Sequence, residues 1–140
     1  ASTIYALREA LRLIAEEGIE ETWARHRRVA GALKAGVEAM GLPLAVAEEH
    51  WMPTLNPVTV PGGVDDGVVI DRLMDEHGIE IVGGLGPLGG EIFRVGCMGH
   101  SARPAKISGF VDAFGSVLAE EGADVDPEAG AVAVNRALRD

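Results

Sequence analysis

The strongest candidate for chemistry in this sequence is Arg94, which follows a glycine-rich loop in a short apolar segment. The run Glu91 to Cys97 alternates as a strand does, so Phe93 and Val95 are expected to face a core while Arg94 points the other way. A guanidinium is always charged and offers a rigid fork of N–H donors, which suits a carboxylate ligand. The residues alone leave two interpretations of Arg94 open, of which the simpler is a solvent-facing strand arginine without a ligand. The other is an anion-binding arginine.

The loop before this strand, Gly83 to Gly90, contains five glycines in eight residues. Glycine adopts backbone conformations closed to other residues, and its missing side chain lets another group approach the backbone closely. A short strand is expected at Ile79 to Val82, because that segment is apolar and rich in β-branched residues. The whole stretch predicts a strand–loop–strand unit in which a ligand or a second chain approaches the glycine loop beside Arg94.

Two other patterns, a possible dinucleotide-binding loop and a possible metal pair, are weaker candidates for a functional site than Arg94. Gly84, Gly86 and Gly89 have the spacing of a dinucleotide-binding loop, but a strand follows them where that motif requires a helix. Cys97 and His100 are spaced like half of a metal site, yet a structural zinc ion needs two further ligands. We expect no metal site and interpret Cys97 as a small core residue and His100 as a loop residue.

The elements that must position Arg94 can be read from hydrophobic periodicity. The expected helices are Ser2 to Glu17, Glu20 to Met40, Asp65 to His77 and Pro104 to Glu121, with a weaker helix after Pro127. The expected strands are Leu44 to Ala47, Val58 to Pro61, Ile79 to Val82 and Glu91 to Cys97. This order predicts an α+β fold with a small three- to four-stranded, mostly antiparallel sheet and helices packed on one face. We divide the chain into an N-terminal helix (1–18), a small domain (19–122) and a C-terminal tail (123–140).

The second and third helices carry further predictions about individual side chains. Trp23 is expected on the buried face of the second helix, and Met74 on that of the third. Arg25 and His26 belong to a cluster of basic residues, which we interpret as a solvated helix face.

Composition excludes several classes of partner. The chain of 140 residues has 22 acidic and 12 basic side chains and a formal net charge of −10, so neither nucleic acid nor an anionic membrane surface is an expected partner. A single cysteine excludes an internal disulfide framework and fits a reducing compartment. We find no apolar run of membrane-spanning length and no signal-peptide pattern, and we expect a soluble, cytoplasmic protein.

Two segments resemble a known family. GGLGPLGGEIFRVGCMGH is similar to the C-terminal signature of class V, fold-type I aminotransferases of the alanine–glyoxylate and serine–pyruvate group, and IYALREALRLIAEEGIEETWARHRRVA is similar to the segment before their small domain. The similarity runs in order from about Ser2 to Glu121. It implies the C-terminal domain of a homodimeric, pyridoxal-phosphate-dependent enzyme that exchanges an amino group between an amino acid and a 2-oxo acid. In this family the arginine at the place of Arg94 binds the substrate α-carboxylate.

The sequence departs from that family in its lysines. The family needs a lysine that binds pyridoxal phosphate covalently, and only Lys34 and Lys106 are present, neither in the strand–loop setting where the family keeps it. We therefore predict that this chain alone binds no cofactor and is inactive. One alternative is a free-standing, non-catalytic amino-acid-binding module. Another is the same domain of a different class V enzyme, such as phosphoserine aminotransferase or cysteine desulfurase.

Overall fold

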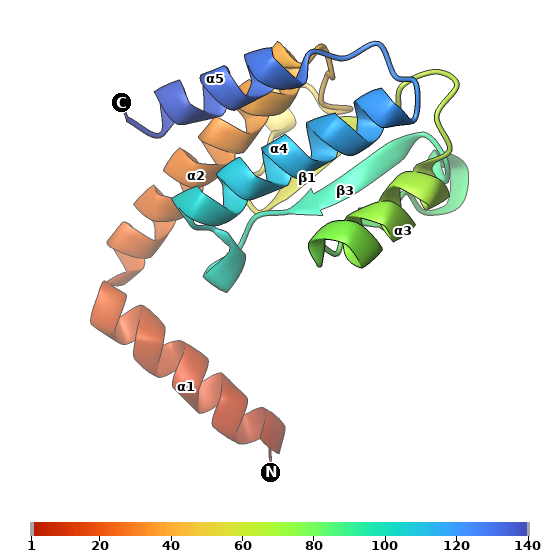
Figure 1. Cartoon of the computed structure of the whole chain (residues 1–140). Helices are drawn as coiled ribbons and strands as arrows, with labels where there is room; N and C mark the ends of the chain where they lie inside the picture. Colours follow the sequence, from red (N-terminus) through yellow and green to blue (C-terminus); the bar gives the residue numbers. More distant parts are fainter. Residues whose placement is uncertain (1, 140) are drawn as a thin grey trace.

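Helices and one small sheet build the part of the chain that the computed structural model describes, residues 2–139 (Figure 1). The helices are α1 (Ser2–Glu17), α2 (Ile19–Ala39), α3 (Asp66–His77), α4 (Pro104–Glu120) and α5 (Pro127–Ala137). The strands are β1 (Leu55–Thr59), β2 (Val82–Gly83) and β3 (Ile92–Gly96). Short 3-10 turns lie at Glu48–His50, Gly86–Leu88 and Gly99–Ser101. The α+β prediction is confirmed, and no described helix has both the length and the apolar character needed to cross a membrane.

The sheet is antiparallel and has the order β1-β3-β2, so the strand that carries Arg94 lies in the middle. Arg94 stands opposite Pro57 of β1 and opposite Val82 of β2. Pro57 has no N–H to donate, and it is tolerated because β1 is an edge strand. β1 begins at Leu55, so the prediction of a strand at residues 58–61 placed its start too late.

Two other strand predictions were partly wrong. Leu44 forms only an isolated bridge with Val58, so the segment 44–47 runs beside β1 without becoming a regular strand. Only Val82 of the segment 79–82 is paired as a strand. The N–H of Ile79 still donates to the carbonyl of Leu73 at 3.0 Å, which ties the beginning of that segment to the end of α3.

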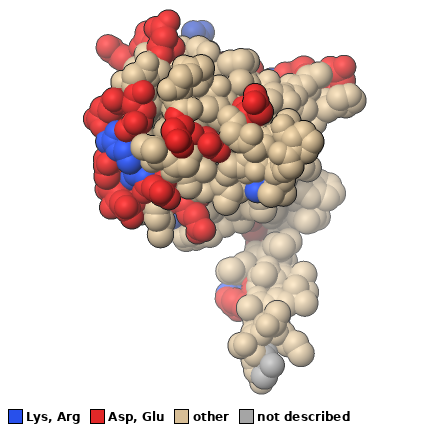
Figure 2. Space-filling model, turned by 90° about the vertical axis from the view of Figure 1, so that its right-hand side faces the viewer, with Lys and Arg blue, Asp and Glu red and all other residues tan. Residues whose placement is uncertain are grey.

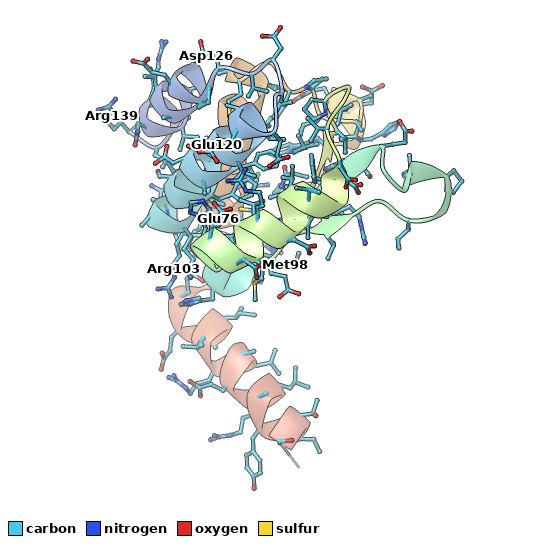
Figure 3. All side chains as sticks on the ribbon, turned by 45° about the vertical axis from the view of Figure 1, so that its right-hand side comes forward. Glu76, Met98, Arg103, Glu120, Asp126 and Arg139 are labelled. Atoms are coloured by element: carbon cyan, nitrogen blue, oxygen red, sulfur yellow. The ribbon has the colours of Figure 1, made fainter. Side chains whose placement is uncertain are left out.

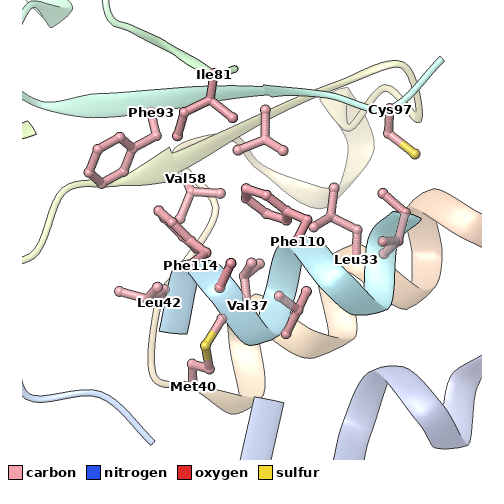
Figure 4. Close-up of a cluster of buried hydrophobic side chains, with 14 of the residues drawn as sticks. Leu33, Val37, Met40, Leu42, Val58, Ile81, Phe93, Cys97, Phe110 and Phe114 are labelled. Carbon is pink, nitrogen blue, oxygen red and sulfur yellow. The ribbon is translucent and has the colours of Figure 1, made fainter. Parts of the chain in front are cut away.

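The core fills one side of the sheet, where side chains of α2, α3 and α4 meet Phe93 and Val95 (Figure 4). Phe114 of α4 is fully buried, and its ring packs edge-on against Phe93 and face-on against Phe110, at centroid distances of 5.2 and 5.1 Å. Such aromatic pairs add to the stabilisation that burial alone provides. The helices therefore cover one face of the sheet, as predicted, and leave Arg94 on the other.

Two apolar side chains that were predicted to be buried are exposed. Trp23 is 55% exposed because it lies in the first turns of α2, which extend beyond the sheet and have no buried apolar residue. Met74 is 53% exposed, since α3 turns only the stripe of Val69 and Leu73 into the core.

The helix after Pro127, expected only as a weak one, is α5, and it lies against α2 and α4 (Figure 1). Glycines make this packing close. A Cβ on Gly36 of α2 would lie 2.3 Å from Cγ2 of Val134, and a Cβ on Gly130 of α5 would lie 2.4 Å from Cγ of Met40. The backbones of α2 and α5 thus approach each other where a side chain would not fit. The division of the chain at residues 18 and 122 stays a prediction.

This packing predicts that replacing two glycines of α2 with alanine changes the stability of the protein in opposite directions. Gly36→Ala is expected to lower the free energy of unfolding by about 1–3 kcal/mol, because the new methyl group overpacks the contact with Val134. Gly31→Ala is expected to raise it by about 0.5–1 kcal/mol, because nothing lies within 4 Å of that position and alanine is the better helix former. Urea unfolding of both variants measures the two signs. A stable Gly36→Ala variant would show that α5 does not pack on α2 as described.

Charged groups join α3 to α4 on the surface. Arg72 of α3 donates to Glu76 at 2.6 Å and to Glu121 at 2.8 Å, and it also pairs with Glu120 of α4. Glu76 and Glu120 lie close to each other in Figure 3. Acidic side chains surround a small basic area on the face shown in Figure 2, in keeping with the net charge of −10. The acidic surface does not favour nucleic acid as a partner.

The first helix stands apart from the rest of the described chain (Figure 1). None of its residues is buried, and its apolar residues Ile4, Leu7 and Leu11 are 73%, 59% and 57% exposed. Gly18, with φ of 89°, forms the bend between α1 and α2. A left-handed conformation is readily adopted only by glycine, so this bend depends on the residue type.

Candidate functional site

The structure places Arg94 half-buried on the sheet face opposite the core. Its neighbours on that face, by strand register, are Pro57 and Val82, and Val82 is 44% exposed. Met98 also reaches this face, because its Cε lies 3.7 Å from the position that a Cβ of Gly96 would take. The guanidinium therefore stands among apolar groups, where a charge–charge contact is less screened than in open water.

Arg94 differs from the other half-buried arginines in its partners. Arg25 and Arg72 both form ion pairs with glutamates. Within residues 2–139 Arg94 forms none, and its one hydrogen bond runs from Nε to the carbonyl oxygen of Gly83 at 2.7 Å. Both Nη nitrogens are thus without a protein acceptor in the described chain. An arginine held in this way can bind an external carboxylate, and this role of Arg94 stays a prediction.

The glycine loop is a compact turn. Leu88 N–H donates to the carbonyl of Leu85 and Glu91 N–H to that of Leu88, each at 3.1 Å. A Cβ on Gly84 would lie 1.8 Å from the carbonyl oxygen of Leu88. At this position the group that approaches the glycine closely is the loop's own backbone, where the sequence suggested a ligand or a second chain. Figure 3 shows the segment between β2 and β3 extending away from the sheet.

The turn after β3 is anchored by two residues of the basic cluster that was interpreted as a solvated face. Arg25 Nη1 donates to the carbonyls of Gly99 and Ala102, at 3.0 and 2.9 Å. His26 Nε2 accepts from the N–H of Gly99 at 2.9 Å. That interpretation was wrong for Arg25 and His26, which are half-buried and connect α2 to the turn that carries Met98. Sequence offered no signal for this, since the contacts span more than 70 residues of chain.

Glu17 completes this anchor from the end of α1. It accepts from Arg25 Nη2 and from Thr22 Oγ1, each at 2.8 Å. The hydrogen bond with Arg25, and after it the one with Thr22, lowers the pKa of Glu17 from 4.5 to about 2. The carboxylate therefore stabilises the folded state only while it is ionised.

This pKa predicts how stability depends on pH. Glu17→Gln is expected to lower the Tm at pH 7, where the carboxylate is ionised in both the folded and the unfolded chain. The difference from the parent should be complete above pH 4.5 and should vanish as the pH falls through about 2, because the folded carboxylate is then protonated. Thermal unfolding of both proteins between pH 2 and 7 measures this. A Tm difference that is constant over that range would mean that the charge of Glu17 does not contribute to the stability of the folded chain.

Cys97 and His100 are not brought together as a metal pair. Cys97 is fully buried in the core cluster, and burial raises the pKa of its thiol to about 11. His100 is exposed in the turn after β3. No group of three or more His, Cys, Asp or Glu side chains among the described residues is arranged to hold a metal ion.

The two lysines do not fit a pyridoxal phosphate site. Lys34 is held by an ion pair with Glu48, and its ammonium lies 5.3 Å from the ring centroid of Trp51. Trp51 in turn donates from Nε1 to Asn56 at 2.9 Å, as suits a packing residue. Lys106 is exposed in the first turn of α4. Neither lysine belongs to the sheet that carries Arg94, and the expectation that this chain alone binds no cofactor stays a prediction.

Comparisons with known proteins relate most of this chain to aminotransferases. No protein-family model matches the chain. The (S)-ureidoglycine–glyoxylate transaminase of Bacillus subtilis is 42% identical over 123 residues, which cover 88% of this chain and 30% of that protein. The alanine–glyoxylate aminotransferase of Felis catus is 38% identical over 117 residues, which cover 83% of this chain and 28% of that protein. This chain thus spans less than a third of the length of these curated relatives.

Solved structures show the same relationship in three dimensions. The ureidoglycine–glyoxylate aminotransferase from Bacillus subtilis superposes with a TM-score of 0.93 and 38% identity, over 97% of this chain and 35% of the solved chain. The pyridoxamine–pyruvate aminotransferase from Mesorhizobium loti superposes with a TM-score of 0.87 and 32% identity, over 92% of this chain and 33% of the solved chain. The chain therefore belongs to the class V aminotransferases of the alanine–glyoxylate type and corresponds to the C-terminal region of these enzymes.

Proposed function

We propose that the full-length protein is a pyridoxal-phosphate-dependent aminotransferase that transfers an amino group to a short 2-oxo acid, and that Arg94 binds the substrate carboxylate. The observation that carries this proposal is the half-buried guanidinium, which has two unengaged Nη nitrogens and no glutamate partner within residues 2–139. The cofactor supplies the amino-transfer chemistry, and its site lies on another part of the polypeptide.

The relatives' names support a short 2-oxo acid as the acceptor. Their amino donors differ, because the names give ureidoglycine, alanine and pyridoxamine. Their acceptors are glyoxylate or pyruvate, both small 2-oxo acids with one carboxylate. A carboxylate is thus common to the acceptors, and an arginine that offers two N–H donors binds it in a fixed orientation.

The chemical role of this chain in such an enzyme is to hold the substrate. Arg94 fixes the carboxylate, so the rest of the small molecule is oriented toward the remainder of the enzyme. The apolar groups around Arg94, such as Val82 and Met98, limit the water that competes for the guanidinium. No residue of the described chain needs to exchange a proton in this role.

Assays of the full-length enzyme test the proposal. Alanine and other small amino acids serve as donors, with glyoxylate or pyruvate as acceptors, and the new amino acid and 2-oxo acid are quantified together. We expect equal amounts of the two products with at least one pair of substrates. Tight amino-acid binding without any transfer would overturn the proposal in favour of a non-catalytic module.

The full-length enzyme is further proposed to be a cytoplasmic homodimer. The single cysteine, buried as a free thiol, is compatible with a reducing compartment. The apolar stripe of α1 is exposed in the isolated chain, and fully burying one such leucine or isoleucine contributes roughly 1.5–3 kcal/mol. A helix with this stripe is more stable against a partner surface than in water.

The exposed stripe predicts that this chain associates through α1. Leu7→Gln combined with Leu11→Gln should make the chain monomeric at concentrations where the parent forms dimers or larger species. Glu9→Gln combined with Arg12→Gln changes the opposite face of α1 and should leave association unaltered. Sedimentation equilibrium measures both. A parent chain that is strictly monomeric while its α1 amides are protected from exchange would contradict this prediction.

A further inference from the structure

The peptide group between Gly83 and Gly84 is the one acceptor that holds Arg94 in the described chain, since the Nε of Arg94 donates to the carbonyl of Gly83 at 2.7 Å. Gly83 is the last residue of β2, and its strand neighbour Val82 stands directly opposite Arg94. The acceptor therefore belongs to the strand adjacent to the arginine. Movement of this peptide would move the guanidinium with it.

Close contacts fix this peptide group from both of its ends. A Cβ on Gly83 would lie 2.8 Å from Oδ2 of Asp66, at the start of α3, and 3.7 Å from Cδ1 of Ile70. A Cβ on Gly84 would lie 1.8 Å from the carbonyl oxygen of Leu88. Both residues that flank the carbonyl are thus at positions where the protein has already filled the space of a side chain. Neither glycine has a positive φ, so space rather than backbone conformation favours glycine here: a side chain would meet backbone at Gly84 and the end of the Asp66 side chain at Gly83.

We propose that Gly83 is a positioning residue for substrate: its carbonyl engages Nε of Arg94 and leaves only the two Nη nitrogens to the carboxylate. This inference rests on the function proposed above for Arg94. The arginine then binds the carboxylate end-on, along the axis of the guanidinium, because the side-on arrangement that uses Nε and one Nη is blocked. The direction in which the substrate leaves the sheet is set by the peptide group of the glycine loop.

The inference assigns a reason to the residue type at position 83. A side chain there would have to displace Asp66, or the backbone of β2 would shift away from α3. A shift of the backbone moves the carbonyl and rotates the guanidinium. The change should therefore weaken recognition of the carboxylate while it leaves the rest of the substrate's contacts in place.

The test compares substrates with and without a carboxylate in the full-length enzyme. Alanine is the carboxylated donor, and ethylamine is the same amine without the carboxylate. For Gly83→Val we expect kcat/KM for alanine to fall at least tenfold, mainly through KM, and the rate with ethylamine to change less than twofold. Gly62→Val is the matched control, because nothing lies within 4 Å of Gly62, and it should change neither substrate.

A second pair of variants keeps the test decisive if valine at position 83 prevents folding. Gly83→Ala should show the same selective loss for alanine in smaller measure, and Asp66→Ala in the same protein should restore it, because the only contact closer than 3 Å is then removed. An equal fall for alanine and ethylamine in a folded variant, or no change for alanine with Gly83→Val, would overturn the inference. If Arg94→Lys itself left alanine unaffected, the proposed function of Arg94 would fail instead.

Discussion

Arg94→Lys in the full-length enzyme is expected to lower kcat/KM for the amino acid by ten- to a hundredfold. Lysine keeps the charge but loses the two-pronged geometry that aligns a carboxylate. It also lacks Nε, so the contact with the Gly83 carbonyl that orients the side chain is lost. A hydrogen bond to a charged group contributes about 1.5–3 kcal/mol, and about 1.4 kcal/mol corresponds to a factor of ten.

The same substitution should change stability little. Arg94 lies outside the core cluster and has no ion pair within the described residues, so the free energy of unfolding should fall by no more than about 1 kcal/mol. Steady-state kinetics and urea unfolding of one preparation separate the two effects. Cofactor content should remain that of the parent. Wild-type kcat/KM together with a large loss of stability would show that Arg94 is structural.

The isolated chain of 140 residues is expected to show no transaminase activity and to take up no pyridoxal phosphate in stoichiometric amount. The physical reason is the setting of its two lysines. Lys34 is engaged by Glu48 and Trp51, and Lys106 is exposed in the first turn of α4. A lysine that reacts with the cofactor is activated by an apolar pocket or a cationic neighbour, whereas Lys34 is paired with a glutamate and Lys106 is open to solvent.

Absorbance spectroscopy of the chain after incubation with the cofactor and dialysis tests this prediction. Lys34→Gln and Lys106→Gln variants are the controls for weak, non-specific reaction at exposed amines. A retained visible band at one cofactor per chain, abolished by one of these substitutions, would contradict the prediction.

The encoding gene separates the two proposed functions. An upstream catalytic domain in the same reading frame would support the aminotransferase, and a start codon near Ala1 would support the free-standing module.

Sequence alone predicted the parts of the fold that depend on repeated patterns. The stripe of α4 that includes Phe110 and Phe114 recurs at helical spacing, and both residues are buried in the core. The alternation in β3 correctly placed Phe93 and Arg94 on opposite faces of the sheet, because successive side chains of a strand point to opposite faces. These features follow from local geometry.

The remaining features depend on what each element meets in space. Periodicity assigned Trp23 to a buried face, but at that end of α2 it is Thr22 that is buried while Trp23 is exposed. The segment from Leu44 to Ala47 has the composition of a strand, yet it finds only one bridge partner. The carbonyl of Gly83 could not be identified as the acceptor for Arg94, because every residue has a carbonyl and only the fold decides which one lies nearby.

The central place of β3 in the sheet has a consequence for the order of events in folding. Its pairing with β2 closes a short loop, whereas its pairing with β1 must bring together segments on either side of α3. Closing the longer loop costs more chain entropy before any contact rewards it, so non-local strand pairing forms slowly. Arg94 has both of its flanking strands only after that step. Complete carboxylate recognition is therefore expected only of the fully folded domain, because nascent or nicked chains that have formed only the β2–β3 hairpin could hold Nε of Arg94 at Gly83 but would lack Pro57 on its other side.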